Sequence, residues 1–348
     1  MLFQILSSMK NLKFAGFMWI VYKMDSTQLI LDALETMRKG DVARGEKFSA
    51  IAYAKAIKGI KELGKPITSV EDVAGIAGIG KKITAKIDEI LKTGKLAAAE
   101  RTKQEINLDI YDTLLKVHGI GPVKARELVN KHSIKSIAEL REKQEELLNE
   151  VQKMGLKYYE DILERIPRAE MIEHNDLLQA HLPKKGHGVV VGSFRREAET
   201  SGDIDMLLAF PPDVSGAKQK KRFEEFVQTL KTEGYIKDIL AQGTKKCMAV
   251  VALPGKKARR LDLLLTPHDE YAYSILYFTG SDKFNVAFRK HALTKGYTLN
   301  EHTMKPLKEE TAHAPPMSTE EDIFRFLGLQ FVEPKNRKGE ENVRTLDS

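Results

Sequence analysis

The stretch Ser201-Gly-Asp-Ile-Asp-Met-Leu-Leu208 has the pattern of a buried β-strand that is interrupted by acids. A second stretch, Arg259-Arg-Leu-Asp-Leu-Leu-Leu265, has the same character. Because side chains alternate along a strand, Asp203 and Asp205 share one face of the first strand. A buried carboxylate is unfavourable unless it is paired or bound to a metal. The two stretches therefore predict a sheet on which Asp203, Asp205 and Asp262 gather for a functional reason.

Groups that bind phosphate stand close to these acids in the sequence. Arg260 shares a strand face with Asp262, and the turn Gly192-Ser193 follows an apolar run at residues 189–191. The planar guanidinium of Arg196 is suited to two phosphate oxygens at once. Mg²⁺ binds carboxylates, and two such ions hold the attacking and leaving oxygens of an in-line displacement. The pattern predicts a two-metal phosphoryl-transfer site. The alternative is a solvent-facing sheet surface with its acids paired to arginine.

Composition narrows the class of protein. The chain has 348 residues and a net charge of +7, which allows several domains and favours a polyanionic partner. Its single cysteine, Cys247, leaves no intramolecular disulfide, which fits a reducing compartment. No apolar run is as long as a membrane-spanning helix requires, so we expect no membrane partner.

The periodicity of apolar residues changes along the chain. From residue 25 to about 166 it is helical. Strands are then expected at residues 189–191, 204–209, 247–253 and 260–265, and the turn at 254–257 joins the last two into an antiparallel hairpin. Helices return after Pro267. The predicted order is an all-helical half, a mixed α/β domain and a smaller α+β domain.

One short element occurs twice in the helical half. Residues 77–85 and 118–125 each place a Gly-Ile-Gly turn directly before a helix. Gly78, Gly80, Gly119 and Gly121 allow a tight turn, and the N–H groups at the start of the following helix face outward. This is the helix-hairpin-helix pattern, which binds the DNA backbone without reading bases. A lone Gly-x-Gly is more often an ordinary turn, but two copies near lysines predict DNA binding.

These motifs together resemble the family X DNA polymerases, and among them DNA polymerase beta, over residues 25–348. The matching stretches are Gly192-Ser-Phe-Arg-Arg196, Ser201-Gly-Asp-Ile-Asp205, Arg259-Arg-Leu-Asp262, Leu276-Tyr-Phe-Thr-Gly-Ser-Asp282, His291-Ala-Leu293 and both Gly-Ile-Gly turns. The resemblance implies a multi-domain α+β fold. N-terminal helical domains with two helix-hairpin-helix motifs would precede a nucleotidyltransferase palm (a mixed β-sheet with helices) and a small α+β thumb.

The resemblance also divides the chain. The expected parts are an extension at 1–24, a lyase-type helical domain at 25–104, a helical DNA-binding domain at 105–166, a catalytic palm at 167–270 and a nucleotide-selection thumb at 271–348. The extension contains lysines and no acid, in the style of an organellar transit peptide, although arginine is missing. The alternative is a dispensable extension before an internal start at Met24.

Roles for single residues follow from the same resemblance. Asp203, Asp205 and Asp262 would ligate two Mg²⁺ ions, and Asp262 would also act on the primer 3′-hydroxyl. The nucleotide would be contacted by Arg165, Ser193, Arg196, Gly202, Tyr277, Phe278, Gly280, Asp282 and Asn285. DNA would be contacted by Gly78, Gly80, Lys82, Gly119, Gly121, Arg260 and Arg289. Without the resemblance, Tyr277 and Phe278 read as core aromatics and Arg289 as a solvated helix residue.

A second chemistry is implied in the helical half. Lys86 stands at the edge of an apolar helix face and matches the Schiff-base lysine of a 5′-deoxyribose-phosphate lyase. Partial burial and cationic neighbours favour the neutral amine that such a nucleophile needs. Tyr53 matches another lyase position, and Lys82 a phosphate-binding one. Without the resemblance, Lys86 reads as a solvated helix lysine.

Several positions depart from polymerase beta. Glu197 replaces a glycine beside the triphosphate site, where a carboxylate would repel phosphate unless it turns outward or pairs with arginine. Leu264 and His302 replace an arginine and a tyrosine that couple thumb closure to the metal site. Phe48 and Ser49 replace a histidine and a lysine of the lyase domain, and Ala74 replaces another lysine, so fewer 5′-phosphate contacts are expected.

The resulting hypothesis is a monomeric polymerase that fills short gaps in base excision repair. Its expected partners are gapped or nicked duplex DNA and dNTPs, with two Mg²⁺ ions as cofactors and a monovalent cation at each hairpin. One alternative is a template-independent nucleotidyltransferase, and another is a non-catalytic DNA-binding scaffold. The nucleus is the expected compartment, with the mitochondrion as the alternative through the acid-poor extension.

Overall fold

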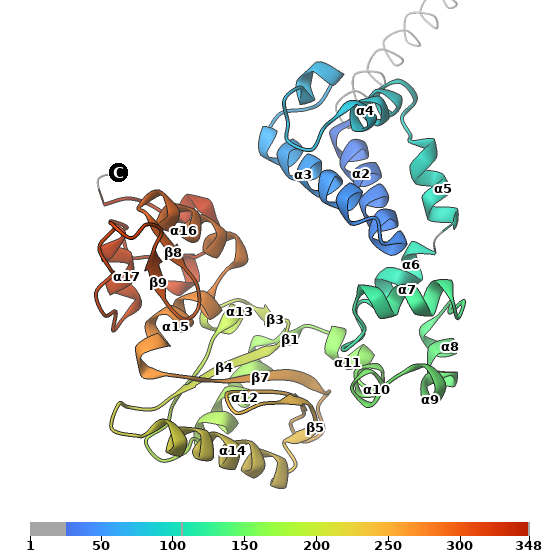
Figure 1. Ribbon diagram of the computed structural model, residues 1–348. Coiled ribbons are helices and arrows are strands. Elements are labelled where there is room, and N and C mark those ends of the chain that lie inside the picture. Colours follow the sequence, from blue (N-terminus) through green and yellow to red (C-terminus); the bar gives the residue numbers. More distant parts are fainter. Residues whose placement is uncertain (1–25, 106, 347–348) are drawn as a thin grey trace, which may run out of the picture. The chain divides into compact units, whose positions relative to one another are not determined.

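The computed structural model describes residues 26–105 and 107–346, in two compact units that divide between Asn149 and Glu150 (Figure 1). We call them the N-terminal unit and the C-terminal unit. The extension expected at 1–24 lies outside the described residues. No helix in the described ranges is both long and apolar enough to cross a membrane.

The described part of the N-terminal unit is built from helices. They are α2 (Ser26–Arg44), α3 (Lys47–Leu63), η1 (Val70–Val73), α4 (Lys81–Thr93), α5 (Ala97–Glu105), α6 (Leu108–Leu114), α7 (Pro122–Asn130), α8 (Ile137–Glu142) and α9 (Gln144–Leu147). One core joins α2, α3 and α4 through apolar residues such as Ile30, Ile60 and Ile87, which are almost completely buried. The predicted helical half is confirmed.

Both Gly-Ile-Gly turns precede a helix, as predicted. Gly78 and Gly119 have positive φ angles of 90° and 84°, a conformation that favours glycine. Gly80 and Gly121 then have extended backbones and cap α4 and α7. Gly78 also packs closely, because a Cβ atom there would lie 2.6 Å from the carbonyl oxygen of Ala52 on α3.

A five-stranded mixed sheet forms the centre of the C-terminal unit (Figure 1). Its order is β2 (His187–Val190), β4 (Ile204–Ala209), β7 (Arg259–Thr266), β6 (Lys246–Val251) and β5 (Ile236–Gln242). Strands β4 and β7 are parallel, and β6 pairs with β7 as the predicted antiparallel hairpin. The sequence did not predict β5. Two register shifts against β6 interrupt its alternation, which hides the strand pattern.

The two faces of the sheet are covered differently. Helices α12 (Arg168–Ala180) and α14 (Gly216–Thr232) bury one face against Met206 and Leu263, together with their neighbours on β4 and β7. On the other face, Leu207 and Leu264 pack against Ile275 of α15 (Tyr271–Thr279). Asp205 and Asp262 stand two residues before these leucines and so share their side of the sheet.

Shorter elements complete the unit around the sheet. Helices α10 (Glu150–Lys157) and α11 (Tyr159–Leu163) pack on the β5–β6 side. The short strands β1 (Ile166–Pro167) and β3 (Thr200–Ser201) pair with each other, and α13 (Gly192–Arg195) follows β2. The remainder comprises η2 (His268–Glu270), α16 (Asp282–Thr294), β8 (Tyr297–Leu299), β9 (Met304–Pro306), α17 (Glu320–Phe326), η3 (Pro334–Asn336) and η4 (Glu340–Asn342).

A buried ion cluster sits in this last part. Glu320 accepts hydrogen bonds from Arg337 and from Arg195 of α13, and Arg337 is completely buried. Phe284 and Phe324 present ring faces to the Arg337 guanidinium. The cluster therefore joins α13, which follows β2, to α17.

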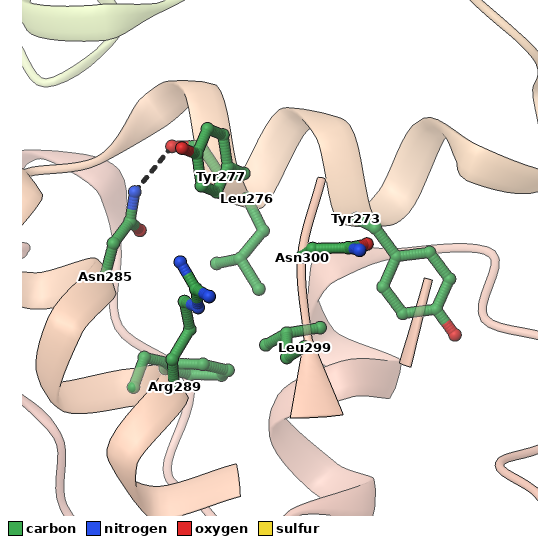
Figure 2. Close-up of a pocket in the computed structure, with 8 residues that line it drawn as sticks. Tyr273, Leu276, Tyr277, Asn285, Arg289, Leu299 and Asn300 are labelled. Atoms are coloured by element: carbon green, nitrogen blue, oxygen red, sulfur yellow. Dashed lines mark hydrogen bonds between the residues drawn. The ribbon is translucent and has the colours of Figure 1, made fainter. Parts of the chain in front are cut away.

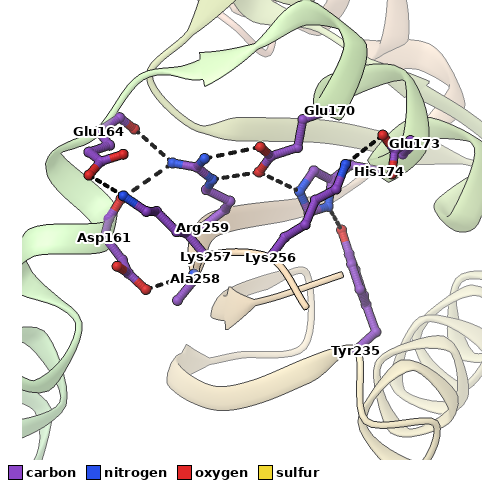
Figure 3. A network of polar contacts seen from close by, with 10 residues as sticks. All are labelled: Asp161, Glu164, Glu170, Glu173, His174, Tyr235, Lys256, Lys257, Ala258 and Arg259. Atoms are coloured by element: carbon purple, nitrogen blue, oxygen red, sulfur yellow. Dashed lines mark hydrogen bonds and ion pairs between the residues drawn. The ribbon is translucent and has the colours of Figure 1, made fainter. Parts of the chain in front are cut away.

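The start of β7 is held by a polar network (Figure 3). Arg259 donates to both carboxylate oxygens of Glu170, at 2.6 and 3.1 Å, and to the carbonyl oxygen of Glu164 at 3.1 Å. Next to Glu170, His174 Nδ1 lies 2.7 Å from the hydroxyl of Tyr235. Because Arg259 precedes Arg260 and Asp262 on β7, the network helps to fix the strand that carries them.

Candidate active site

The three predicted acids lie at one place on the sheet. In the parallel pairing of β4 with β7, Asp205 stands directly opposite Asp262. Burial and then the charges of Asp203 and Asp262 raise the pKa of Asp205 to about 7. The side chains therefore form one electrostatic cluster, drawn from strands that are far apart in the sequence.

Two cations balance these acids. Arg260 donates to Asp203, and its Nε lies 3.7 Å from Asp262 Oδ1. Lys246 Nζ lies 3.5 Å from Asp262 Oδ2. Sequence analysis did not single out Lys246, although the predicted hairpin contained the signal: Met248 pairs with Asp262, and Lys246 is two residues away on the same face of β6.

The cluster has the chemistry of a metal site, but its acids are engaged. Within the described ranges, no group of three His, Cys, Asp or Glu side chains has its present positions arranged to hold a metal ion. The donor set nevertheless fits a hard divalent cation, which prefers carboxylate oxygens. Asp262 Oδ1 is buried without a hydrogen-bond partner, and the pKa of Asp205 is raised partly by its acidic neighbours. A divalent cation at this place would give Asp262 Oδ1 a partner and would offset the repulsion between Asp205 and its acidic neighbours.

The predicted phosphate-binding residues lie around the same strand. Gly192 begins α13 beside Asp205, since a Cβ there would lie 3.2 Å from Asp205 Oδ2. The Ser193 hydroxyl donates to Ser201 at 2.9 Å. Arg165 donates to the carbonyl and hydroxyl oxygens of Thr200 and borders Gly202. The structure thus brings Arg165, Ser193 and Gly202 to the β3–β4 end of the acid cluster.

Arg196 connects this region to the thumb residues. Its guanidinium donates to the carbonyl oxygen of Thr279 and lies 3.1 Å from the position that a Cβ on Gly280 would occupy. Burial lowers the pKa of Arg196, while the nearby Asp282 carboxylate opposes that shift. Arg196, Gly280 and Asp282 are therefore neighbours, as expected for residues that share one ligand.

The other predicted thumb residues line a small pocket (Figure 2). Asn285 donates to the carbonyl oxygen of Tyr277 at 2.7 Å, and Arg289 borders the same pocket. Asn300, which sequence analysis did not select, also lines it. Phe278, near the end of α15, instead packs against the apolar cluster of Val191, Leu207 and Ile275.

The departures from polymerase beta have local explanations. Glu197 is exposed and has a φ of 59°, a left-handed conformation in which glycine is free of strain. Leu264 packs in the apolar layer between the sheet and α15. His302 Nδ1 lies 2.6 Å from Glu270 Oε2, so this position connects the β8–β9 turn to η2.

The predicted lyase residues belong to the N-terminal unit. Lys86 is partly buried on α4, beside the buried Ile83 and Ile87, and Lys82 is exposed one turn earlier. Tyr53 belongs to the same apolar core, and burial raises its pKa. Phe48 is 91% exposed near the start of α3.

A mixed sheet with acids on adjacent parallel strands, next to a glycine-serine turn and arginines, defines the palm of a nucleotidyltransferase. Family comparisons agree over most of the chain. Residues 165–268 match the DNA polymerase beta palm, residues 274–338 the DNA polymerase beta thumb, residues 25–96 a helix-hairpin-helix domain and residues 112–163 the fingers domain of DNA polymerase lambda. The chain belongs to family X of the DNA polymerases.

Similar proteins include DNA polymerase lambda of Rattus norvegicus, which is 31% identical over 326 residues, or 88% of this chain and 56% of the relative. DNA polymerase lambda of Arabidopsis thaliana is 31% identical over 317 residues, or 85% and 59%. DNA nucleotidylexotransferase of Xenopus laevis is 27% identical over 354 residues, or 90% and 68%. The chain thus spans somewhat more than half the length of the polymerase lambda relatives.

Proposed function

We propose that this chain is a DNA-directed DNA polymerase that fills short gaps during base excision repair. The pairing of Asp205 with Asp262, with Asp203 directly before β4, is the observation that carries the proposal. Acids at this position on a sheet are unfavourable unless a cation joins them. Membership of family X supports the same conclusion.

In this proposal Asp203, Asp205 and Asp262 hold two Mg²⁺ ions. When bound, the ions lower the pKa of the primer 3′-hydroxyl and stabilise charge on the transferred phosphoryl group. Asp262 would accept the proton of the 3′-hydroxyl, and its buried Oδ1, which has no hydrogen-bond partner, supports this role. Arg165, Ser193, Arg196 and Gly202 would bind the triphosphate of the incoming dNTP; the close approach of the adjoining Gly192 to Asp205 and the hydrogen bond from Ser193 to Ser201 support that role.

The thumb residues would select the nucleotide. Tyr277, Gly280 and Asn285 contact its sugar and base edge, Asp282 stacks against the base, and Arg289 faces the template. The hydrogen bond from Asn285 to the Tyr277 carbonyl holds these groups in a fixed relation before a nucleotide arrives. Such preorganisation favours productive binding of a matched base.

The two hairpins would bind the phosphates that flank a gap or a nick. Gly78 and Gly119 turn the chain directly before α4 and α7, and N–H groups in the first turn of a helix can face a phosphate. A monovalent cation at each turn would strengthen the contact. We expect a monomer that acts in the nucleus, with the mitochondrion as the alternative.

A second activity is proposed for the N-terminal unit. Lys86 would attack the aldehyde carbon of a 5′-deoxyribose phosphate and remove the sugar remnant through a Schiff base. Its place on α4, partly buried beside Ile83 and Ile87, supports this role, and the nearby exposed Lys82 would hold the 5′-phosphate.

A pair of substitutions tests both activities on one-nucleotide-gapped DNA that carries a 5′-deoxyribose phosphate. Asp262→Ala should reduce Mg²⁺-dependent primer extension by roughly a thousandfold and preserve sugar removal, because several kcal/mol of charge stabilisation are lost at one site only. Lys86→Ala should abolish sugar removal and borohydride trapping but preserve extension.

Each substitution has a matched control. Asp213→Asn changes an exposed palm acid that pairs with Lys185, and Lys92→Ala changes an exposed lysine of α4. Both should keep both activities. Full extension by the Asp262→Ala variant would contradict the metal assignment, and trapping of the Lys86→Ala variant would contradict the lyase assignment.

A template-independent transferase is the second candidate, favoured by the similarity to DNA nucleotidylexotransferase. The template base decides between the two. A templated polymerase should incorporate only the complementary dNTP opposite each base in the gap, whereas a template-independent enzyme should extend a single strand. If neither substrate showed Mg²⁺-dependent incorporation, the non-catalytic DNA-binding scaffold would be the remaining hypothesis.

A further inference from the structure

Arg260 occupies the middle of the acid cluster. It donates to Asp203 through its terminal nitrogen, and its Nε lies 3.7 Å from Asp262 Oδ1. One guanidinium is thus shared between Asp203, which directly precedes β4, and Asp262 of β7. It stands between two of the carboxylates that are proposed to hold metal.

The hydrogen bonding of this group is incomplete. Arg260 Nε and Asp262 Oδ1 are both buried, and neither has a hydrogen-bond partner. At 3.7 Å, their separation is too long for a hydrogen bond, so the guanidinium balances charge without satisfying Asp262. Leaving buried polar atoms without partners is unfavourable, so a cation that bonds Asp262 Oδ1 would be preferred at this place.

We propose that Arg260 is an internal counter-ion that competes with divalent metal: in the free protein it holds Asp203, and a metal ion binds there only by displacing it. This inference rests on the proposed two-metal function. Arg260 is suited to the role because it lies on β7 beside Asp262 and reaches Asp203 across the β4–β7 pair. Its competition lowers the metal affinity of the DNA-free protein.

Displacement would also change what Arg260 can bind. A guanidinium released from Asp203 has its donors free for a phosphate, and Arg260 is one of the predicted DNA contacts. The same side chain cannot face Asp203 and a DNA phosphate at once. Metal binding and DNA binding would therefore favour each other through this one residue.

Lys246 does not have the same role. Its Nζ lies 3.5 Å from Asp262 Oδ2, on the side of Asp262 away from the oxygen nearest Arg260, and its side chain is 49% exposed. A flexible, solvated ammonium is a weak competitor for a divalent ion. Replacement of Lys246 should therefore change metal affinity less than replacement of Arg260.

The test is a titration of the full DNA-free chain with MnCl₂, followed by the electron paramagnetic resonance of free Mn²⁺ and without any activity measurement. Arg260→Gln should bind Mn²⁺ roughly tenfold more tightly than the unchanged protein, since a charged hydrogen bond no longer competes. Arg260→Lys should fall between them. Lys257→Gln, which removes a positive charge that pairs with Glu164, should leave the affinity unchanged.

Thermal unfolding in EDTA and in MnCl₂ gives a second readout and shows whether each variant folds. In EDTA, where its acids repel one another, the Arg260→Gln variant should unfold at a lower temperature than the unchanged protein. Its unfolding temperature should rise more than that of the unchanged protein when Mn²⁺ is added. Equal or weaker Mn²⁺ binding by Arg260→Gln, with normal binding by the unchanged protein, would overturn the counter-ion role alone. No Mn²⁺ binding by any variant would overturn the two-metal site as well.

Discussion

At the scale of single residues, neighbours in space decide what an acid or a base does. Asp205 has a raised pKa because it is buried beside two other acids, although its own sequence context is apolar. Glu197 occupies a left-handed turn that suits glycine, and it does so at the surface. The clearest measurable case is His174, because it is buried within the network of Figure 3.

The stability of the C-terminal unit should depend on pH through His174. Burial lowers its pKa to about 4 from the ordinary value of 6.5. Between these values the unfolded chain binds a proton that the folded protein does not, so stability is complete above pH 6.5 and is lost as the pH falls. The loss by pH 4 should be about 3 kcal/mol. Urea unfolding of His174→Gln should show a flatter pH dependence in this window.

The control for this experiment is His313→Gln, at an exposed histidine. It should keep the pH dependence of the unchanged protein. If His174→Gln and His313→Gln lost stability equally on acidification, burial of His174 would not be the cause.

At the scale of elements, turns and registers place the chemistry. The parallel pairing of β4 with β7 sets Asp205 against Asp262, and a shift of one residue would turn one acid toward the α12–α14 core. In the N-terminal unit, each hairpin depends on a first glycine with positive φ and a second one that caps the next helix. The two glycines of a hairpin thus have different structural tasks.

Two alanine substitutions separate these tasks. Gly78→Ala would force a Cβ to within 2.6 Å of the Ala52 carbonyl at a φ of 90°, so it should destabilise the packing of α3 with α4 by more than about 1 kcal/mol. Gly80→Ala meets open space at an extended backbone, so it should cost only the poorer N-cap preference of alanine, roughly 0.5 kcal/mol. Hydrogen exchange over α3 and α4 measures both; equal protection in the two variants would contradict this account.

At the scale of the whole molecule, charge and phosphate contacts should govern DNA affinity. The chain carries a net charge of +7 and two helix-hairpin-helix turns that we propose bind phosphates. Proteins of this kind release counterions on binding, so affinity for one-nucleotide-gapped DNA should fall about a thousandfold or more between roughly 50 and 200 mM salt. Fluorescence anisotropy measures the slope. Asp262→Ala should keep the same slope, because it removes no phosphate contact; a flat dependence in the unchanged protein would argue against backbone binding.

Local pattern was enough to predict much of this protein. The helical half, both hairpin turns, the β6–β7 hairpin and the acids at positions 203, 205 and 262 can be read from the sequence, because helix periodicity, glycine turns and strand alternation are properties of short segments. Strand β5 escaped prediction, because its register shifts break the alternation on which such a prediction depends. The role of Lys246 escaped as well, because it follows from pairing across strands.

Only the tertiary structure decided how the acids meet and what joins them. The parallel β4–β7 register brings together residues that are more than fifty positions apart, and the same register places Arg260 between Asp203 and Asp262. Sequence by itself determined which residues carry charge and where the helical half and most strands of the central sheet form. It did not determine their partners, because burial and Coulomb interactions depend on distances through space rather than on separation along the chain.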